Sequence, residues 1–446
     1  MAGAGLVDLL VLGRVATLEG VHGFGWVEAL AIGEGRVVAA GRRADVEPLA
    51  GAGTRRLVLD PARHVALPGL TDAHLHLVDA AVAEEELDLT RAPDAGAVLA
   101  AVSEAHRARA RSGDQDGWLL GRGWAVDRLG AWPTAEALEA VAPGRPVALW
   151  SHDHHARWVS PAALAQAGID AASADPRGGS LHRDEQGRPT GVLHEHAAKL
   201  VDRAIPGRDD EAAARALEAY ARRLWAWGIV GCHDPGEASP EPDLHRGPAL
   251  LGRLAAEGRL PVRVHACVRA EQLDRAAELG LRSGAGVEPD DRSPGMARAS
   301  ARFRVGWLKH FADGTLGSAT AALLAPYEGL AGDALPSGPA GGLLLSPEEL
   351  AADLRRAARA GLVAMVHAIG DRAVRVALDA IEASLPEARE THGGELPLAP
   401  RLEHVQLLDP TDRPRFGALG VAASIQPAHL RTDRGPAQRL WGRRAE

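Results

Sequence analysis

From about residue 210 onward, short apolar runs alternate with longer amphipathic stretches along the chain. The runs have the length and composition of buried strands, and the stretches between them have helical spacing. This alternation is typical of parallel βα units. We expect strands at residues 229–233, 261–268, 304–311, 362–367, 401–406 and 421–426. We expect helices that include residues 210–227, 249–257, 347–360 and 373–385.

A further apolar run at residues 65–76 precedes this alternation and brings the expected strands to seven. The natural architecture for such a chain is an α/β fold of the (β/α)8 TIM-like barrel type. Residues 1–64 contain shorter apolar or alternating segments separated by Gly-rich turns, which predict a small β-sheet module. Its strands are expected at residues 6–12, 27–32, 36–40 and 56–59. The domain prediction is therefore a β-module at 1–64 and a barrel domain at 65–446.

Residues 84–209 do not follow the βα alternation. They are rich in Trp, Pro and Gly and include the run Ser151-His152-Asp153-His154-His155. We interpret them as a large insertion after the first barrel strand. Residues 284–300 combine Gly, Asp, Ser, Pro and Arg, which predicts a mobile loop.

Composition limits the classes of function. The 446 residues are 46% apolar and 24% charged, as in an ordinary soluble globular protein. The net charge of −9 gives no reason to expect nucleic acid or an anionic membrane surface as a partner. We find neither a signal peptide nor an apolar run that could span a membrane. The only two cysteines, Cys232 and Cys267, exclude a disulfide framework and fit a reducing cytoplasm.

Histidine or lysine occurs at the ends of most predicted barrel strands, which is where the active site of such a barrel lies. Side chains two residues apart in a strand face the same side, so His74 and His76 would point the same way. Imidazole nitrogens with a negative oxygen ligand suit zinc and similar divalent ions, so the set predicts a metal centre. The strand-end residues are His74, His76, His233, Asp234, Lys309, His310, Asp313, His367, Asp371, His404, Gln426 and His429.

Lysine is rare in this chain. Only Lys199 and Lys309 are lysines among the 50 basic residues, and all the others are arginine. A lysine that remains can supply a primary amine, which arginine cannot. Carboxylation of Lys309 by carbon dioxide would give an anionic carbamate able to bridge two metals. The alternative is that Lys309 is a surface lysine in a loop.

Several motifs together resemble the amidohydrolase superfamily, in the YtcJ-like branch that contains N-substituted formamide deformylases. The first is Leu67-Pro68-Gly69-Leu70-Thr71-Asp72-Ala73-His74-Leu75-His76, preceded by the β-rich segment. The others include Lys309-His310-Phe311-Ala312-Asp313-Gly314-Thr315, His367-Ala368-Ile369-Gly370-Asp371, Arg401-Leu402-Glu403-His404-Val405-Gln406 and Ser424-Ile425-Gln426-Pro427-Ala428-His429.

The resemblance implies hydrolysis of an amide by metal-activated water. His74 and His76 would bind the more buried metal, Lys309 would bridge as its carbamate or bind directly, and His367 and His404 would hold a second metal. One or two Zn²⁺ ions are the expected cofactor, and Lys309 and His404 are the expected catalytic residues. The candidates for lining the pocket of a small-molecule amide substrate are Trp124, His155 and Asp313.

The chain departs from the family pattern in one respect. The superfamily has an aspartate at the end of strand eight, as metal ligand and proton shuttle, and the sequence shows neither that strand nor the strands that complete the N-terminal β-sandwich. We therefore expect an incomplete barrel and little hydrolase activity from residues 1–446 alone. Unpaired barrel edges favour aggregation or pairing with another chain, for which a homodimer is one form.

Three functions stay open at this point. The leading one is cleavage of a non-peptide C–N bond, in an exocyclic amide such as an N-acyl or N-formyl amine. The same metal centre supports cyclic-amide hydrolysis or deamination, because fold and ligands do not select the substrate. The third is a non-catalytic metal-binding or scaffold protein.

Overall fold

The computed structural model describes residues 7–19, 23–114, 116–152, 156–176, 179–206, 210–236, 247–287, 293–317, 319–328 and 338–445. The chain forms two compact units. The first takes in the residues up to Thr71 together with Trp227–Gly231, and the second takes in the rest. Within the described ranges, no helix is both long enough and apolar enough to cross a membrane.

The first unit contains a four-stranded sheet in the order β3-β2-β1-β4. Strand β1 pairs antiparallel with β2 and parallel with β4, and β2 pairs antiparallel with β3. Leu10, Leu12, Ala29 and Ala31 form most of its core. All four strands were predicted, and they are Leu9–Ala16, Trp26–Gly33, Arg36–Gly41 and Arg55–Val58 for β1 to β4.

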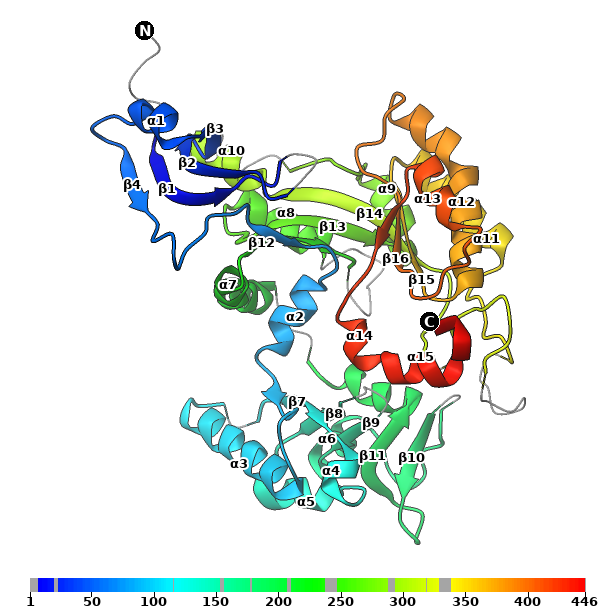
Figure 1. Cartoon of the computed structure of the whole chain (residues 1–446). Helices are drawn as coiled ribbons and strands as arrows, with labels where there is room; N and C mark the ends of the chain where they lie inside the picture. The colour runs from blue at the N-terminus through cyan, green and yellow to red at the C-terminus, as the bar shows by residue number, and fades with distance from the viewer. Residues whose placement is uncertain are drawn as a thin grey trace. The chain divides into compact units, whose positions relative to one another are not determined.

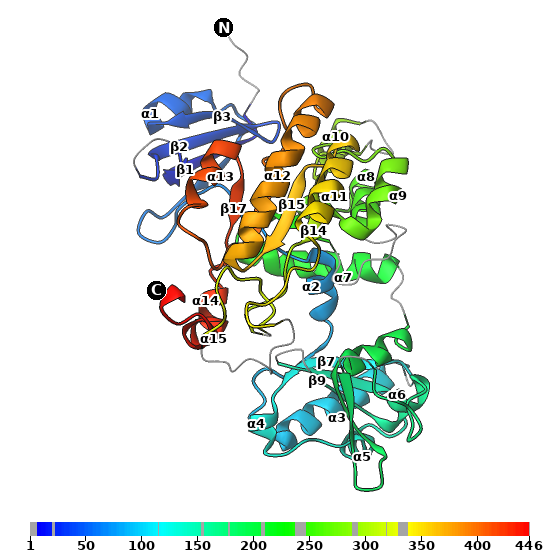
Figure 2. The ribbon, with the colours of Figure 1, turned by 90° about the vertical axis from the view of Figure 1, so that its right-hand side faces the viewer.

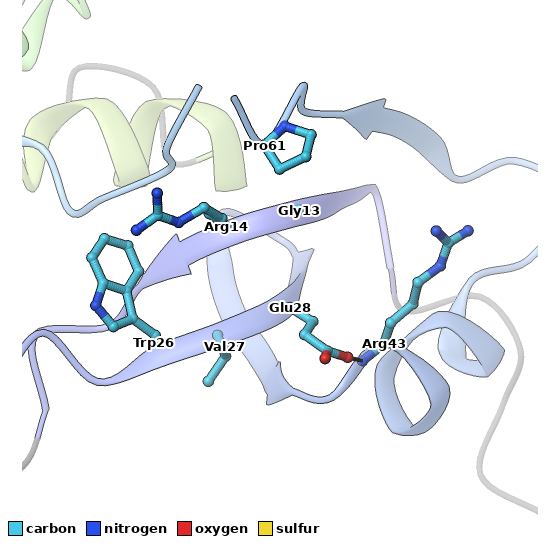
Figure 3. Close-up of a pocket in the computed structure, with 7 residues that line it drawn as sticks. All are labelled: Gly13, Arg14, Trp26, Val27, Glu28, Arg43 and Pro61. Carbon is cyan, nitrogen blue, oxygen red and sulfur yellow. Dashed lines mark hydrogen bonds between the residues drawn. The ribbon is translucent and has the colours of Figure 1, made fainter. Parts of the chain in front are cut away.

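An open groove lies on this sheet (Figure 3). The Arg14 guanidinium stands 4.6 Å from the centroid of the Trp26 ring, and the Glu28 carboxylate accepts a hydrogen bond from the Arg43 backbone N–H. The aromatic and charged groups that line this groove thus contact one another in two pairs, Arg14 with Trp26 and Glu28 with Arg43.

A seven-stranded sheet in the order β17-β16-β15-β14-β13-β12-β5 provides the frame of the predicted barrel domain. Neighbours from β13 to β17 pair in parallel and in sequence order, as the βα alternation predicted. The sheet is curled (Figure 1). Strands β5 and β17 are the two ends of its order. The strands are Leu70–Asp72 (β5), Ile229–Asp234 (β12), Arg263–Arg269 (β13), Phe303–Phe311 (β14), Ala364–Ala368 (β15), Arg401–His404 (β16) and Ala422–Ser424 (β17).

The helices between the strands begin where the sequence marks them. Helix α11 (Pro347–Arg359) has a capping box, in which Ser346 Oγ accepts from the Glu349 N–H and the Glu349 carboxylate accepts from the Ser346 N–H. It packs along α12 (Asp371–Thr391), and together they cover one face of β14 and β15 (Figure 2). The other predicted helices are α7 (Asp210–Ala226) and α8 (Pro248–Ala256).

Two local predictions were wrong. The run 65–76 forms a strand only at Leu70–Asp72, because the Asp72 carboxylate accepts from the His74 N–H and turns the chain. His74 and His76 therefore lie in the turn before α2 (Leu77–Ala83), not in a strand. The segment expected as a loop at 284–300 contains a helix, α10 (Pro294–Ser300), capped by Ser293 Oγ.

The predicted insertion contains a second, mixed sheet in the order β10-β11-β9-β8-β7-β6. Its core includes the indoles of Trp124 and Trp158, packed edge to face against each other. These two tryptophans thus serve packing within the insertion. The strands are Leu87–Asp88 (β6), Leu119–Trp124 (β7), Val147–Ser151 (β8), Ala156–Val159 (β9), Gly179–Arg183 (β10) and Pro189–Glu195 (β11). The main helices are α3 (Ala95–Arg111), α5 (Ala135–Val141) and α6 (Pro161–Gln166).

Candidate metal centre

Four imidazoles gather at the carboxyl end of the seven-stranded sheet. His74 and His76 come from the turn after β5, His367 from β15 and His404 from the end of β16. Ring centroids lie 5.6 Å apart for His74 and His76, and 5.0 Å apart for His74 and His404. The His367 and His404 centroids are 4.5 Å apart. Residues from three separate stretches of the chain thus meet as the strand-end argument predicted.

Each of these imidazoles gives one ring nitrogen to an oxygen acceptor. His74 Nδ1 lies 2.5 Å from Glu403 Oε2, and His76 Nδ1 lies 2.5 Å from the Gly236 carbonyl oxygen. Because a carbonyl oxygen can only accept, the nitrogen that faces it carries the hydrogen. The same holds for a carboxylate. His74 and His76 therefore keep the lone pair on Nε2.

His404 and His367 also give one ring nitrogen to a protein oxygen, but the two rings use different nitrogens. His404 Nδ1 lies 2.7 Å from the side-chain oxygen of Gln426, which leaves the lone pair on Nε2. His367 uses Nε2 instead, 3.0 Å from the Gly314 carbonyl oxygen, and so keeps its lone pair on Nδ1. A metal-binding imidazole ordinarily donates its other ring N–H to such an acceptor, which fixes the ring and its tautomer.

Burial keeps three of these rings neutral. Burial, together with the charge of the neighbouring Lys309, lowers the pKa of His367 to about 3. Burial, together with the neighbouring His367 and Lys309 charges, lowers the pKa of His404 to about 2. Burial also lowers the pKa of His76. Since only a neutral imidazole has a lone pair to give, these three rings are in the form that binds a metal ion.

Lys309, in β14, is the lysine that the sequence singled out. It is 1% exposed, and its Nζ is among the buried side-chain atoms without a hydrogen-bond partner in the described part of the chain. Burial lowers the pKa of its amine to about 8, although Glu403 opposes the shift. The alternative of a surface lysine is therefore excluded, and the amine is an orphaned buried polar group that needs an explanation.

The donor set fits a divalent ion in chemistry and in spacing. Zinc binds imidazole nitrogen at about 2.0–2.1 Å, which places the ring centroids of two ligands on one tetrahedral ion roughly 5 Å apart. The separations of 5.6 Å for His74 and His76 and 4.5 Å for His367 and His404 agree with that value. Among the described residues, however, no three His, Cys, Asp or Glu side chains are arranged to hold one ion by themselves. A metal ion here would need a further ligand, and Lys309 is the predicted one.

The backbone at His404 is held in a left-handed conformation, with φ of 74°, and Val405 follows with φ of 44°. A β-branched residue in this region is strained, and such strain concentrates at functional sites. The Val405 N–H is held by the Ala368 carbonyl oxygen at 3.0 Å. The tight turn directly after His404 therefore sets where that imidazole stands.

The sequence analysis did not assign a role to a buried charge pair beneath the imidazoles. Glu403 is fully buried, and its Oε1 accepts from Arg401 Nε at 2.9 Å while its Oε2 accepts from His74. Burial alone would raise the pKa of Glu403, but the His74 hydrogen bond and the Arg401 charge outweigh it and hold the pKa at about 2. A glutamate and an arginine two apart inside a predicted strand were the signal that could have identified the pair.

With this geometry, comparison with known proteins decides the family. Residues 62–442 match the amidohydrolase family. The chain belongs to this family. It is 32% identical over 371 residues to YtcJ of Bacillus subtilis (strain 168), covering 83% of this chain and 64% of that protein. The chain thus spans less than two thirds of the length of this relative.

Two further relatives agree with that assignment. N-substituted formamide deformylase of Arthrobacter pascens is 27% identical over 409 residues, covering 90% of this chain and 69% of that protein. Among solved structures, an uncharacterised metal-dependent hydrolase from Pyrococcus furiosus superposes with a TM-score of 0.73 at 26% identity. That match covers 98% of this chain and 80% of the other.

In this amidohydrolase-family chain, Asp313 fastens two loops beside His367. Its Oδ2 accepts from the backbone N–H groups of Ala322 and Gly370, both at 2.9 Å, and its Oδ1 accepts from Ile369 at 3.0 Å. Burial raises the pKa of Asp313 to about 6 against these three donors. Its carboxylate is engaged with the backbone, and contact with a substrate stays a prediction.

The other predicted residues lie in different surroundings. Trp124 is 1% exposed in the core of the insertion, and its Nε1 donates to the Leu149 carbonyl oxygen, so the structure assigns it a packing role. Its contact with substrate is untested. His155 lies outside the described residues. His310 pairs with Asp353 on α11 instead of joining the imidazole group.

Replacement of Asp313 tests its structural role. Asp313→Asn puts an amide N–H₂ where one carboxylate oxygen accepted, so at least one buried backbone N–H loses its partner. We expect the free energy of unfolding to fall by about 1–3 kcal/mol in urea titration. Asp274→Asn, at an exposed ion pair with Arg356, should change it by less than about 0.5 kcal/mol. Equal stability of Asp313→Asn and wild type would contradict the role.

Proposed function

We propose that the protein carrying this chain is a metal-dependent hydrolase of a non-peptide C–N bond, in an exocyclic amide such as an N-acyl or N-formyl amine. One observation carries the proposal. Four imidazoles each give one ring nitrogen to a protein oxygen and keep the other for a ligand, beside the buried amine of Lys309, which has no hydrogen-bond partner among the described residues.

His74 and His76 would hold one divalent ion through Nε2, and His367 and His404 would hold a second through Nδ1 and Nε2. Imidazole ligands suit zinc. A bound ion of this kind lowers the pKa of water and polarises an amide carbonyl. Hydrolase activity is consistent with the family and with the metal-dependent hydrolase that resembles this chain.

Lys309 would contribute as its carbamate. The neutral amine nitrogen would attack the carbon of CO₂, an N–C bond would form as one C=O π bond breaks and its electrons go to the oxygen, and the nitrogen would lose one proton to water. The product would replace a buried amine by an anion with two oxygens, which suits a position between two cations. Burial lowers the pKa of the Lys309 amine to about 8, which raises the fraction present as the neutral, nucleophilic amine.

The substrate part of the proposal rests on the relatives. The Arthrobacter pascens relative is named as a deformylase of N-substituted formamides, and that chemistry is the exocyclic amide cleavage proposed for this chain. Trp124, His155 and Asp313 remain the proposed substrate contacts.

The two lysines give a matched pair of variants. Lys309→Arg keeps a cation but cannot form a carbamate, and we expect zinc affinity to fall more than about 100-fold, beyond the loss typical of an outer-shell partner. Lys199→Arg, at an exposed position, should bind zinc as wild type does. The measurement is competition with a chromophoric chelator. Wild-type zinc affinity in Lys309→Arg would exclude Lys309 as a ligand.

Turnover tests the reaction itself, on the protein in the length that its gene encodes. We expect release of amine from N-formyl and N-acyl amines, lost after chelation and restored by Zn²⁺. Cyclic amides and aminated heterocycles serve as competing substrates. Preference for these would favour the cyclic-amide or deaminase alternative, and zinc binding without any turnover would favour a non-catalytic protein.

A further inference from the structure

We propose that Glu403 is a positioning residue that sets the tautomers of two imidazoles, His74 directly and His404 through Gln426. The inference rests on the proposed function only in treating these imidazoles as metal ligands. The hydrogen-bond relay itself is a property of the metal-free protein.

The relay starts from the fixed direction of the Glu403 carboxylate. Its Oε1 is occupied by Arg401 Nε at 2.9 Å, which leaves Oε2 for His74 Nδ1 at 2.5 Å. An ionised carboxylate has no hydrogen to donate, so His74 must be the donor. This bond alone fixes the His74 tautomer.

Gln426 links Glu403 to the second imidazole, that of His404, by hydrogen bonds. Its Nε2 lies 2.9 Å from the Ser424 carbonyl oxygen and 3.3 Å from Glu403 Oε2. Two acceptors on this side require the N–H₂ group there, so the amide oxygen has to face His404 Nδ1, at 2.7 Å. His404 Nδ1 must then carry the hydrogen, which leaves Nε2 for a metal.

Arg401 holds the start of the relay in place. Its guanidinium stacks 4.7 Å from the centroid of the Trp307 ring and donates to the Ala73 carbonyl oxygen at 2.8 Å and to His233 Nδ1 at 2.6 Å. The Ala73 bond anchors the backbone next to His74. One arginine thus fixes both the carboxylate that His74 meets and the turn from which His74 projects.

A neutral amide at position 403 would change which groups donate and which accept at the start of the relay. In Glu403→Gln, Arg401 still needs an acceptor and takes the amide oxygen, so the N–H₂ group faces His74 Nδ1, which must then accept. The Ser424 carbonyl and this N–H₂ group favour opposite orientations of the Gln426 amide. Gln426→Met cuts the relay at its second step only. It should release His404 and leave His74 unchanged, which a general loss of stability would not do.

The test reads ring tautomers by long-range ¹H–¹⁵N NMR of metal-free protein labelled with ¹⁵N-histidine. His74→Gln and His404→Gln assign the two rings. In wild type, both rings should carry the hydrogen on Nδ1. In Glu403→Gln, His74 should carry the hydrogen on Nε2, His404 should show mixed tautomers, and zinc affinity should fall about 10- to 100-fold. In Gln426→Met, only His404 should change.

Asp353→Asn is the control, because it makes the same acid-to-amide exchange at another imidazole, His310. It should leave His74 and His404 unchanged. If Glu403→Gln does not fold because Arg401 loses its counter-charge, Gln426→Met decides. Unchanged His404 in Gln426→Met overturns the relay. If the tautomers change as expected but wild type binds no zinc, the relay holds and the proposed function fails.

Discussion

The arrangement of the candidate centre depends on hydrogen bonds that fix one nitrogen of each imidazole to an oxygen of the protein. The acceptors come from several stretches of the chain: the Gly236 and Gly314 carbonyls, the Glu403 carboxylate and the Gln426 amide. Without these bonds, each ring could exchange its tautomer or rotate. With them, four lone pairs remain in defined positions around the amine of Lys309.

The parallel sheet makes this possible because successive strands bring distant residues to one edge. Phe311 pairs with His367 across β14 and β15, and Ala368 pairs with His404 across β15 and β16. The register therefore places His367 and His404 on adjacent strands, offset by one residue, because His367 itself pairs with Glu403. Asp313 joins the loops that follow β14 and β15 by hydrogen bonds to their backbone N–H groups. The backbones of these loops also approach each other closely, since a Cβ at Gly370 would lie only 2.0 Å from the Ala322 carbonyl oxygen. The loops beside His367 are thus closely packed.

Much of this could be predicted from the sequence, and the failures have physical causes. Apolar periodicity located the strands of the curled sheet, and the rarity of lysine pointed to Lys309. The pattern around His74 was misread as strand because the turn depends on one side-chain hydrogen bond from Asp72. The hydrogen bonds of Glu403 and Gln426 to the imidazoles could not be predicted, because the pairing of a donor on one strand with an acceptor on another leaves no periodic pattern in the sequence. The packing role of Trp124 was not predicted, because an indole that packs a core and one that lines a site look alike in sequence.

The central claim is that these imidazoles and Lys309 bind a divalent ion. Anomalous scattering at the zinc edge, from crystals of this chain grown with Zn²⁺, tests it most directly. The account predicts a peak within about 2.0–2.1 Å of the Nε2 atoms of His74 and His76, with additional density on Lys309 Nζ. No peak at this position, with zinc bound elsewhere or not at all, would contradict it.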